Sequence, residues 1–269
     1  MTGRPSFETL LLSVRDGVAT LTLNRPKVAN AASPTMMREL LLALDQIEES
    51  ESGVRCLLLT GAGRAFCAGA DLSPGVSGAD NVGTRDGGFD LEHFYHPVLR
   101  RLRDLKFPLL VAVNGAAVGV AASIALMGDL ILCGRSAYFL HAFRAVGLVP
   151  DGGATWLLPR LVGRARALEI SLLGERLSAE TALEWGLVNR VYEDDALMEE
   201  AHTLAHGVAG GPTLALGLTR QLYWASAGNS YEEQLHAERL SQRCAAASDD
   251  FDEGIAAFRQ KRPPRFEGR

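Results

Sequence analysis

Apolar and polar residues recur with two different periods near the start of this chain. Two apolar runs, "TLLLSV" and "VATLTL", flank the turn pair Asp16-Gly17, which predicts a β-hairpin. A helix should follow, with Ser33 as its N-cap and Pro34 as its first residue. Its apolar stripe has helical spacing and consists of Met36, Met37, Leu40, Leu41, Leu44 and Ile47.

Further along, strands and helices alternate, and the chain then becomes helical. Buried strands are expected at residues 54–60, 109–113 and 130–134, and a last short strand at 187–192. Residues 73–90 hold five glycines and predict a mobile loop, followed by a helix from about 91 to 106. From Asp194 onward only amphipathic helices are expected. The pattern predicts an α/β core domain at 1–193 and a helical subdomain at 194–269.

Composition narrows the class of protein. The 269 residues are 47% hydrophobic and 22% charged, which is typical of a soluble globular protein. The net charge of −5 and the absence of a basic run argue against nucleic acid as a partner. Four scattered cysteines form no C-x-x-C pair, which favours neither a zinc site nor disulfides and suits a reducing compartment. No signal peptide is recognisable in the first ten residues, so a cytoplasmic location is expected.

One uncharged stretch, residues 107–128, is long enough to span a bilayer over its 22 positions. Pro108 and the pair Asn114-Gly115 divide it, and half of its residues are small. A buried strand, a turn and a buried helix are therefore the favoured interpretation, and no membrane association is expected.

Two segments share one design, in which a strand leads through a glycine-rich turn into small residues. They are "LLLTGAGRAFCAGADL" and "LLVAVNGAAVGVAAS". Two converging turns of this kind can form an oxyanion hole from backbone N–H groups, but small residues also suit tight helix–sheet packing. A dinucleotide site is rejected, because Gly61 and Gly63 are followed by Phe66 where the fingerprint needs a third glycine.

These segments resemble the two signature segments of the enoyl-CoA hydratase/isomerase (crotonase) superfamily. Residues 21–33, 177–191 and 251–266 are similar to its other segments, in order and almost without gaps. The resemblance implies a spiral of ββα units, an acyl-CoA thioester substrate, and assembly as a homotrimer or hexamer through the C-terminal helices. Coenzyme A enters as part of the substrate, and neither a metal nor another cofactor is implied.

The resemblance also assigns backbone roles. It places the two oxyanion donors at the N–H groups of Ala68 and Val120, where valine replaces the usual glycine. The residues expected to contact the substrate are Ala68, Gly69, Ala70, Asp71, Gly119, Val120 and Phe143. Cys67, beside the first donor, is expected to be a small buried residue without a reactive thiolate.

The acidic residues depart from the family's hydratases, which use two glutamates. The matching positions hold Ser123 and Phe143, and neither can act as a general acid or base. Asp151 lies where members that shift double bonds carry a carboxylate, although Pro-Asp-Gly is also a common turn. Residues 142–167 look most like the branch that isomerises ring-epoxidised phenylacetyl-CoA and like the Δ3,Δ2-enoyl-CoA isomerases.

The sequence therefore predicts an enoyl-CoA double-bond isomerase with Asp151 as its base. Two alternatives stay open: an enoyl-CoA hydratase, and a catalytically weak acyl-CoA-binding protein that retains the glycine-rich turns. His141, two residues before Phe143, is interpreted as a structural histidine, with a pocket-lining role as the alternative.

Overall fold

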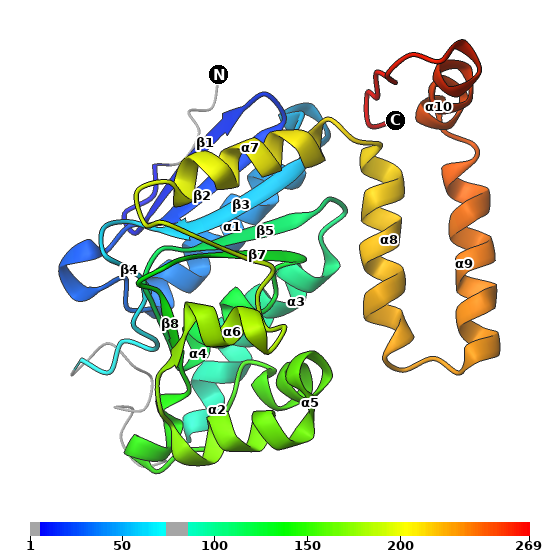
Figure 1. Ribbon diagram of the computed structural model, residues 1–269. Coiled ribbons are helices and arrows are strands. Elements are labelled where there is room, and N and C mark those ends of the chain that lie inside the picture. The colour runs from blue at the N-terminus through cyan, green and yellow to red at the C-terminus, as the bar shows by residue number, and fades with distance from the viewer. Residues whose placement is uncertain (1–5, 74–85) are drawn as a thin grey trace.

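The computed structural model describes residues 6–73 and 86–269, and these form two β-sheets surrounded by helices (Figure 1). The larger sheet has the strand order β1-β2-β3-β5-β7-β10 and the smaller one the order β4-β6-β8-β9. The strands of the larger sheet are β1 (Leu10–Arg15), β2 (Val18–Leu23), β3 (Cys56–Gly61), β5 (Leu109–Val113), β7 (Leu130–Gly134) and β10 (Arg190–Tyr192). Those of the smaller sheet are β4 (Ala65–Cys67), β6 (Ala116–Val118), β8 (Tyr138–Leu140) and β9 (Leu177–Ser178).

The chain repeats one path through both sheets, which confirms the predicted spiral of ββα units. Each turn of the spiral takes a strand of the larger sheet, then a strand of the smaller sheet, then helical residues. The helices of these turns are α2 (Gly87–Asp90) with α3 (His96–Asp104), α4 (Val120–Ala125), and α5 (Ala154–Leu173). Neighbouring spiral strands run parallel, so the carboxyl ends of β4, β6 and β8 lie at one edge of the smaller sheet.

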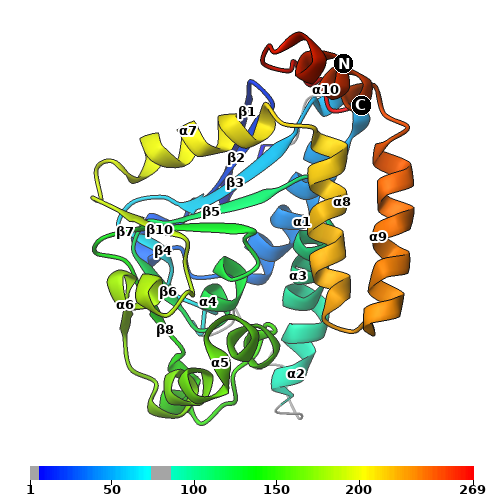
Figure 2. The same cartoon turned by 45° about the vertical axis from the view of Figure 1, so that its right-hand side comes forward.

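Both faces of the larger sheet are covered by helices (Figure 2). Helix α1 (Pro34–Glu48) packs on one face together with α3, and the hydroxyl of Ser33 accepts a hydrogen bond from the N–H of Met36, as the predicted N-cap requires. Helix α7 (Leu197–Ala209) lies beyond the predicted boundary at residue 194 and packs on the other face. The division of the chain into 1–193 and 194–269 stays a prediction.

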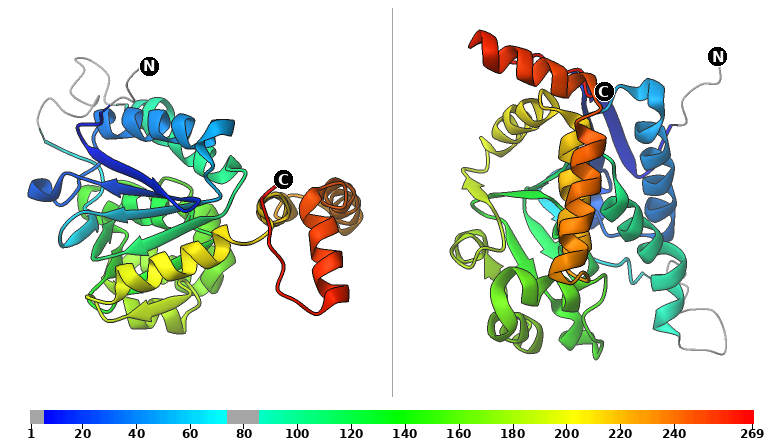
Figure 3. Two further views of the ribbon diagram at one scale, coloured as in Figure 1. Left: turned by 90° about the horizontal axis from the view of Figure 1, so that it is seen from above. Right: turned by 90° about the vertical axis from the view of Figure 1, so that its right-hand side faces the viewer.

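The last three helices stand apart from this body: α8 (Thr213–Ser226), α9 (Tyr231–Ala245) and α10 (Asp249–Gln260) (Figure 3). Helix α8 is anchored by Arg220, whose side chain is 4% exposed and forms a 2.8 Å ion pair with Asp129. The same guanidinium donates to the backbone carbonyls of Leu102 and Leu105. Asp129 also accepts from the N–H of Leu109 at the start of β5, so one carboxylate holds the strand and the helix together.

The structure contains most of the elements that the sequence pattern predicts. The hairpin, α1, the three buried strands and the late helices are confirmed. The predicted loop at 73–90 falls largely outside the described residues, but Gly87–Asp90 is helical. Residues 107–128 form β5, β6 and the short helix α4, and among the described residues no helix is long and apolar enough to span a membrane.

Candidate active site

Two neighbouring strand ends of the smaller sheet bring both glycine-rich turns together. Strands β4 and β6 run parallel, with Ala65 opposite Ala116. Just after β4, Gly69 has a φ of +94°, a conformation that favours glycine. A Cβ at this position would lie 2.8 Å from the carbonyl oxygen of Val118, the last residue of β6. The two turns therefore meet backbone to backbone.

The second turn presents the first residue of a short helix. Gly119 is the N-cap of α4, with φ +56° and ψ −128°, and its N–H donates to the carbonyl of Leu140. Val120 is the first helical residue, and its N–H has no acceptor among the described residues, as expected in the first turn of a helix. Val120 thus offers the main-chain donor that the resemblance predicts.

The first turn does not leave the N–H of Ala68 free. That N–H donates to the carbonyl of Ala29 at 2.9 Å, and the N–H of Asp71 donates to the carbonyl of Ala32 at 2.9 Å. Within the described parts of the chain, the N–H groups of Gly69 and Ala70 have no acceptor; Ala70 is exposed, whereas Gly69 is buried. A substrate oxygen would compete with a backbone carbonyl for Ala68 but not for Ala70. The assignment of the first donor to Ala68 therefore needs correction by two residues.

Asp71 is paired with other residues of the chain, and its predicted contact with the substrate stays a prediction. Its side chain is 6% exposed and lies 2.8 Å from a guanidinium nitrogen of Arg25. It also accepts from the N–H of Ser73 at 3.1 Å. Burial alone would raise the pKa of Asp71, but the hydrogen bonds from Ser73 and Arg25 lower it overall. The carboxylate is thus ionised and already paired.

Asp151 lies in the turn that precedes α5 and is fixed against α4. The hydroxyl of Ser123 donates to the carbonyl oxygen of Asp151 at 2.9 Å. Gly152 packs so closely that a Cβ there would lie 2.8 Å from the Cβ of Ser123 and 3.2 Å from a methyl group of Val120. Ser123 cannot act as an acid or base, but it holds the turn of Asp151 beside the start of α4.

The carboxylate of Asp151 is not that of an ordinary solvated turn. Its Oδ1 atom is buried and has no hydrogen-bond partner among the described residues. Burial raises the pKa of Asp151 to about 6, and the nearby His96 opposes this increase only in part. Buried polar atoms in proteins are nearly always hydrogen-bonded, so an unpaired carboxylate oxygen needs an explanation. A buried carboxylate with a raised pKa, on a turn packed against the start of α4, is a candidate catalytic base.

Phe143, His141 and Cys67 are all buried. Phe143 is 7% exposed, and its ring lies 3.9 Å from where a Cβ of Gly119 would be. His141 is 1% exposed, and burial lowers its pKa to about 4, so it is neutral at physiological pH. Both ring nitrogens of His141 are buried without a hydrogen-bond partner among the described residues, so the structural and the pocket-lining interpretations both stay open. Cys67 is buried, as predicted, and burial raises the pKa of its thiol to about 12, in keeping with the expectation that it is not a reactive thiolate.

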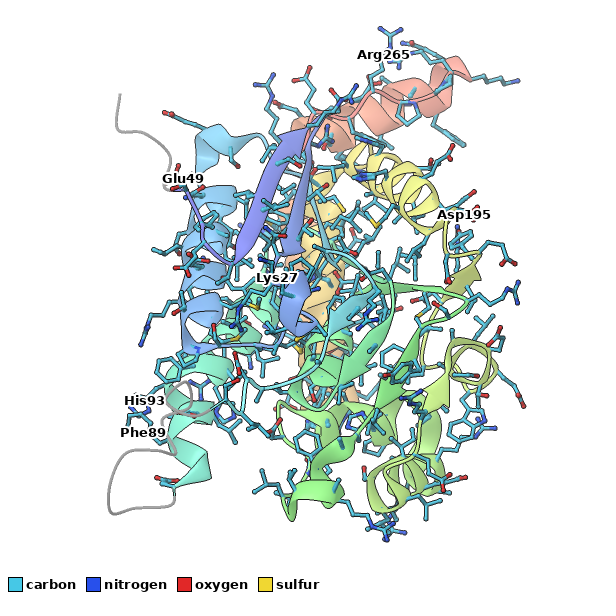
Figure 4. All side chains as sticks on the ribbon, turned by 90° about the vertical axis from the view of Figure 1, so that its left-hand side faces the viewer. Lys27, Glu49, Phe89, His93, Asp195 and Arg265 are labelled. Carbon is cyan, nitrogen blue, oxygen red and sulfur yellow. The ribbon has the colours of Figure 1, made fainter. Side chains whose placement is uncertain are left out.

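Tyr95 and His96 belong to the same region, and the sequence offered no signal for either. Tyr95 is 6% exposed and donates its hydroxyl to the carbonyl of Ala32 at 2.9 Å. Burial raises its pKa, and the charges of Cys67, Asp90, Asp151 and Asp71 add to the increase. Both residues lie where the segment after α2 joins α3. They come near Asp151 only through the tertiary fold, so no local sequence pattern indicates it. The stacked rings of Phe89 and His93, one turn earlier, point away from the body (Figure 4).

The pKa of Asp151 predicts how the rate depends on pH. A base must be ionised to accept a proton, so activity should increase as pH rises through about 6 and then level off. An ordinary aspartate would instead titrate near 3.9. The measurement is kcat/KM for a 3-enoyl-CoA between pH 4.5 and 8, with fold stability monitored at each pH. A rate that stays constant down to pH 4.5 would show that the base is a solvated carboxylate or another group.

The fold, the converging turns and the carboxylate of Asp151 point to a class of acyl-CoA enzymes, and sequence comparison agrees. Residues 13–269 match the enoyl-CoA hydratase/isomerase family, and the chain belongs to that family. It is 47% identical to the 1,2-epoxyphenylacetyl-CoA isomerase of Escherichia coli over 98% of this chain and 100% of that protein. It is 34% identical to the 2,3-dehydroadipyl-CoA hydratase of the same organism, over 97% of this chain and 99% of that protein.

Solved structures agree with this membership. The crystal structure of an enoyl-CoA hydratase from Bacillus anthracis superposes with a TM-score of 0.90 at 29% identity. The alignment covers 97% of this chain and 100% of that one. The similarity therefore includes the C-terminal helices as well as the spiral core.

Proposed function

We propose that this protein is an enoyl-CoA double-bond isomerase with Asp151 as its single acid–base group. The main support is the carboxylate of Asp151. One of its oxygens is buried without a hydrogen-bond partner among the described residues, and the residue lies on a turn packed against Val120. The free N–H groups of Val120 and Ala70 supply the complementary donors. A carboxylate and an oxyanion hole are together sufficient to move a proton next to a thioester carbonyl.

The proposed reaction shifts a double bond along one face of the acyl chain. The carboxylate of Asp151 removes a proton from the carbon next to the thioester carbonyl. Negative charge then develops on the thioester oxygen, which accepts hydrogen bonds from the N–H groups of Ala70 and Val120. The carboxylic acid of Asp151 returns the proton two carbons further along, and the double bond moves from the 3,4 to the 2,3 position.

The name of the E. coli relative supports a ring-derived acyl group as the physiological substrate, as in phenylacetate breakdown. The same proton transfer applies to a linear 3-enoyl-CoA, because a ring-derived and a linear acyl group both require a proton to move near the thioester carbonyl. Only protons move, so the proposed mechanism includes neither a metal nor a redox cofactor. The cysteines at 56, 67, 133 and 244 are all free, which supports a cytoplasmic location.

Hydration of crotonyl-CoA is expected to be slow relative to isomerisation of a 3-enoyl-CoA. Hydration needs a group that activates water and a group that protonates carbon, and Ser123 and Phe143 occupy the family's positions for these roles. Each acid–base role contributes about 10²–10⁴-fold to a rate. Both rates are measured with the same purified protein, without added metal or nicotinamide. Rapid hydration would favour the hydratase alternative, and no turnover of either substrate would favour an acyl-CoA-binding protein.

We also propose that the chain assembles as a homotrimer or hexamer. The helices that stand apart from the body expose large apolar side chains: Tyr223, Tyr231, Leu235, Leu240, Phe251 and Phe258. Apolar surface of this extent on projecting helices is typical of a protein–protein interface. Light scattering at micromolar concentration should give three or six times the 28.9 kDa chain mass. A monomeric mass would contradict this assembly.

A further inference from the structure

The turn that carries Ala70 is held by a neighbouring segment, residues 24–33, which we call the strap. The N–H of Ala32 donates to the carbonyl of Gly69 at 2.7 Å, and the N–H of Asp71 donates back to the carbonyl of Ala32 at 2.9 Å. Ala70 lies between these two bonds and pairs with Ala32 as in a parallel bridge. The strap therefore fixes the backbone on both sides of Ala70 and leaves the N–H of Ala70 itself free. Lys27 marks this segment in Figure 4.

Arg25 connects the strap to the turn through its side chain. One guanidinium nitrogen lies 2.8 Å from Asp71 Oδ2 and also donates to the carbonyl of Ala31. The backbone N–H of Arg25 donates to the side-chain oxygen of Asn30 at 2.8 Å. Asn30 is 0% exposed, and its amide nitrogen donates to the carbonyls of Ala62 and Ala65, just before the turn. Arg25 is thus tied to both ends of the loop that carries the donor.

Because Asp71 is negatively charged, its ion pair with Arg25 is relevant to the proposed reaction as well as to the fold. Asp71 directly follows Ala70, and its side chain is 6% exposed. In the proposed reaction, negative charge leaves Asp151 and develops on the thioester oxygen beside Ala70. A second unpaired carboxylate near this point would oppose that charge, and the effect is stronger where water is excluded. The guanidinium of Arg25 balances the carboxylate of Asp71 and holds its backbone in place.

We propose that Arg25 is a positioning residue for the oxyanion donor Ala70 and that it acts through Asp71. The role rests on the proposed function, because it concerns how the same N–H groups polarise a thioester carbonyl. It predicts that losing the arginine matters mainly because Asp71 is left as an unpaired negative charge. Removing both charges should therefore be less harmful than removing the arginine alone.

The experiment compares four variants in the full-length protein: Arg25→Met, Arg25→Lys, Asp71→Asn, and the double variant Arg25→Met/Asp71→Asn. Arg101→Met is the matched control, since Arg101 pairs with Asp45 and Glu48 between α1 and α3, away from the turn. The readouts are kcat with a 3-enoyl-CoA, the Kd of cinnamoyl-CoA, and the red shift of bound cinnamoyl-CoA absorbance. That red shift reports polarisation of the thioester carbonyl, and cinnamoyl-CoA has no double bond that the reaction can move.

Arg25→Met is expected to lower kcat on the order of 10- to 100-fold and to reduce the red shift, with little change in Kd. Arg25→Lys should retain most of the shift, and the double variant should recover most of the loss. A folded Arg25→Met protein with the parent's kcat and red shift would overturn the role, as would a double variant no better than Arg25→Met. A parent protein that binds cinnamoyl-CoA without any red shift would overturn the oxyanion site itself.

Discussion

Replacing Asp151 with asparagine should abolish most of the isomerase activity while leaving acyl-CoA binding intact. Asparagine keeps the shape of the side chain and removes the only acid–base group on the turn packed against α4. We expect a loss of at least about 10²-fold in kcat, with KM and the Kd for a substrate analogue near the parent values. Steady-state kinetics and calorimetric binding measure the two effects separately.

The same substitution should stabilise the fold at neutral pH. Asp151 has a folded-state pKa of about 6, above the value of about 3.9 for an unfolded chain, so its ionised form destabilises the folded state. This penalty develops as pH rises from the unfolded pKa to the folded pKa and is complete above it. The Tm of Asp151→Asn should therefore exceed the parent's at pH 7.5, and the difference should disappear near pH 4. An active variant with a lower Tm would identify Asp151 as a turn residue.

Val120→Pro should reduce the rate by about 10²–10³-fold, the effect of losing one oxyanion donor. Val120 is the first residue of α4, a position where proline is favoured because its missing N–H has no partner in the helix. Gly119 before it has the backbone freedom to accommodate a following proline. The substitution thus removes one free N–H without removing a hydrogen bond of the fold.

Val120→Ala is the matched control, because it shortens the side chain and keeps the N–H. Its kcat should stay within about tenfold of the parent's, since the oxyanion bond comes from the main chain. Circular dichroism and CoA-ester binding must first show that both variants fold. Equal activity in the proline and alanine variants would exclude Val120 from the oxyanion hole. Ala68→Pro is a poorer test, since it would also break the hydrogen bond from Ala68 to Ala29.

The long periodic elements of the fold were predictable from the sequence, and the short ones were not. Helix α1 has fifteen residues, an N-cap at Ser33 and a continuous apolar stripe, so its pattern is unambiguous. Strands β4, β6 and β8 have three residues each, too few for an alternating pattern. They form because the parallel neighbours of the spiral supply their hydrogen bonds. The smaller sheet therefore depends on contacts between distant parts of the chain and cannot be predicted from a local sequence pattern.

The candidate site was likewise only partly predictable from the sequence. Asp151 and Val120 follow from residue type and position in the resemblance, and the structure places both at one turn of α4. We propose Ala70 rather than Ala68 as the first donor because an N–H is available only if no carbonyl accepts it. Here the accepting carbonyl belongs to Ala29, some forty positions earlier in the chain. The pairing of Asp71 with Arg25 depends on the same tertiary contact.

Deuterium incorporation tests the central claim most directly, because it reports removal of the proton by the base. Parent protein and Asp151→Asn would be incubated in D₂O with a 3-enoyl-CoA, and the recovered acyl-CoA analysed by mass spectrometry and NMR. Once the carboxylic acid of Asp151 has exchanged with D₂O, the parent should incorporate deuterium two carbons beyond the site of proton removal, and next to the thioester carbonyl when the first step reverses. Asp151→Asn should bind the substrate and incorporate deuterium at least about 10²-fold more slowly. Incorporation by Asp151→Asn at the parent's rate would show that another group is the base.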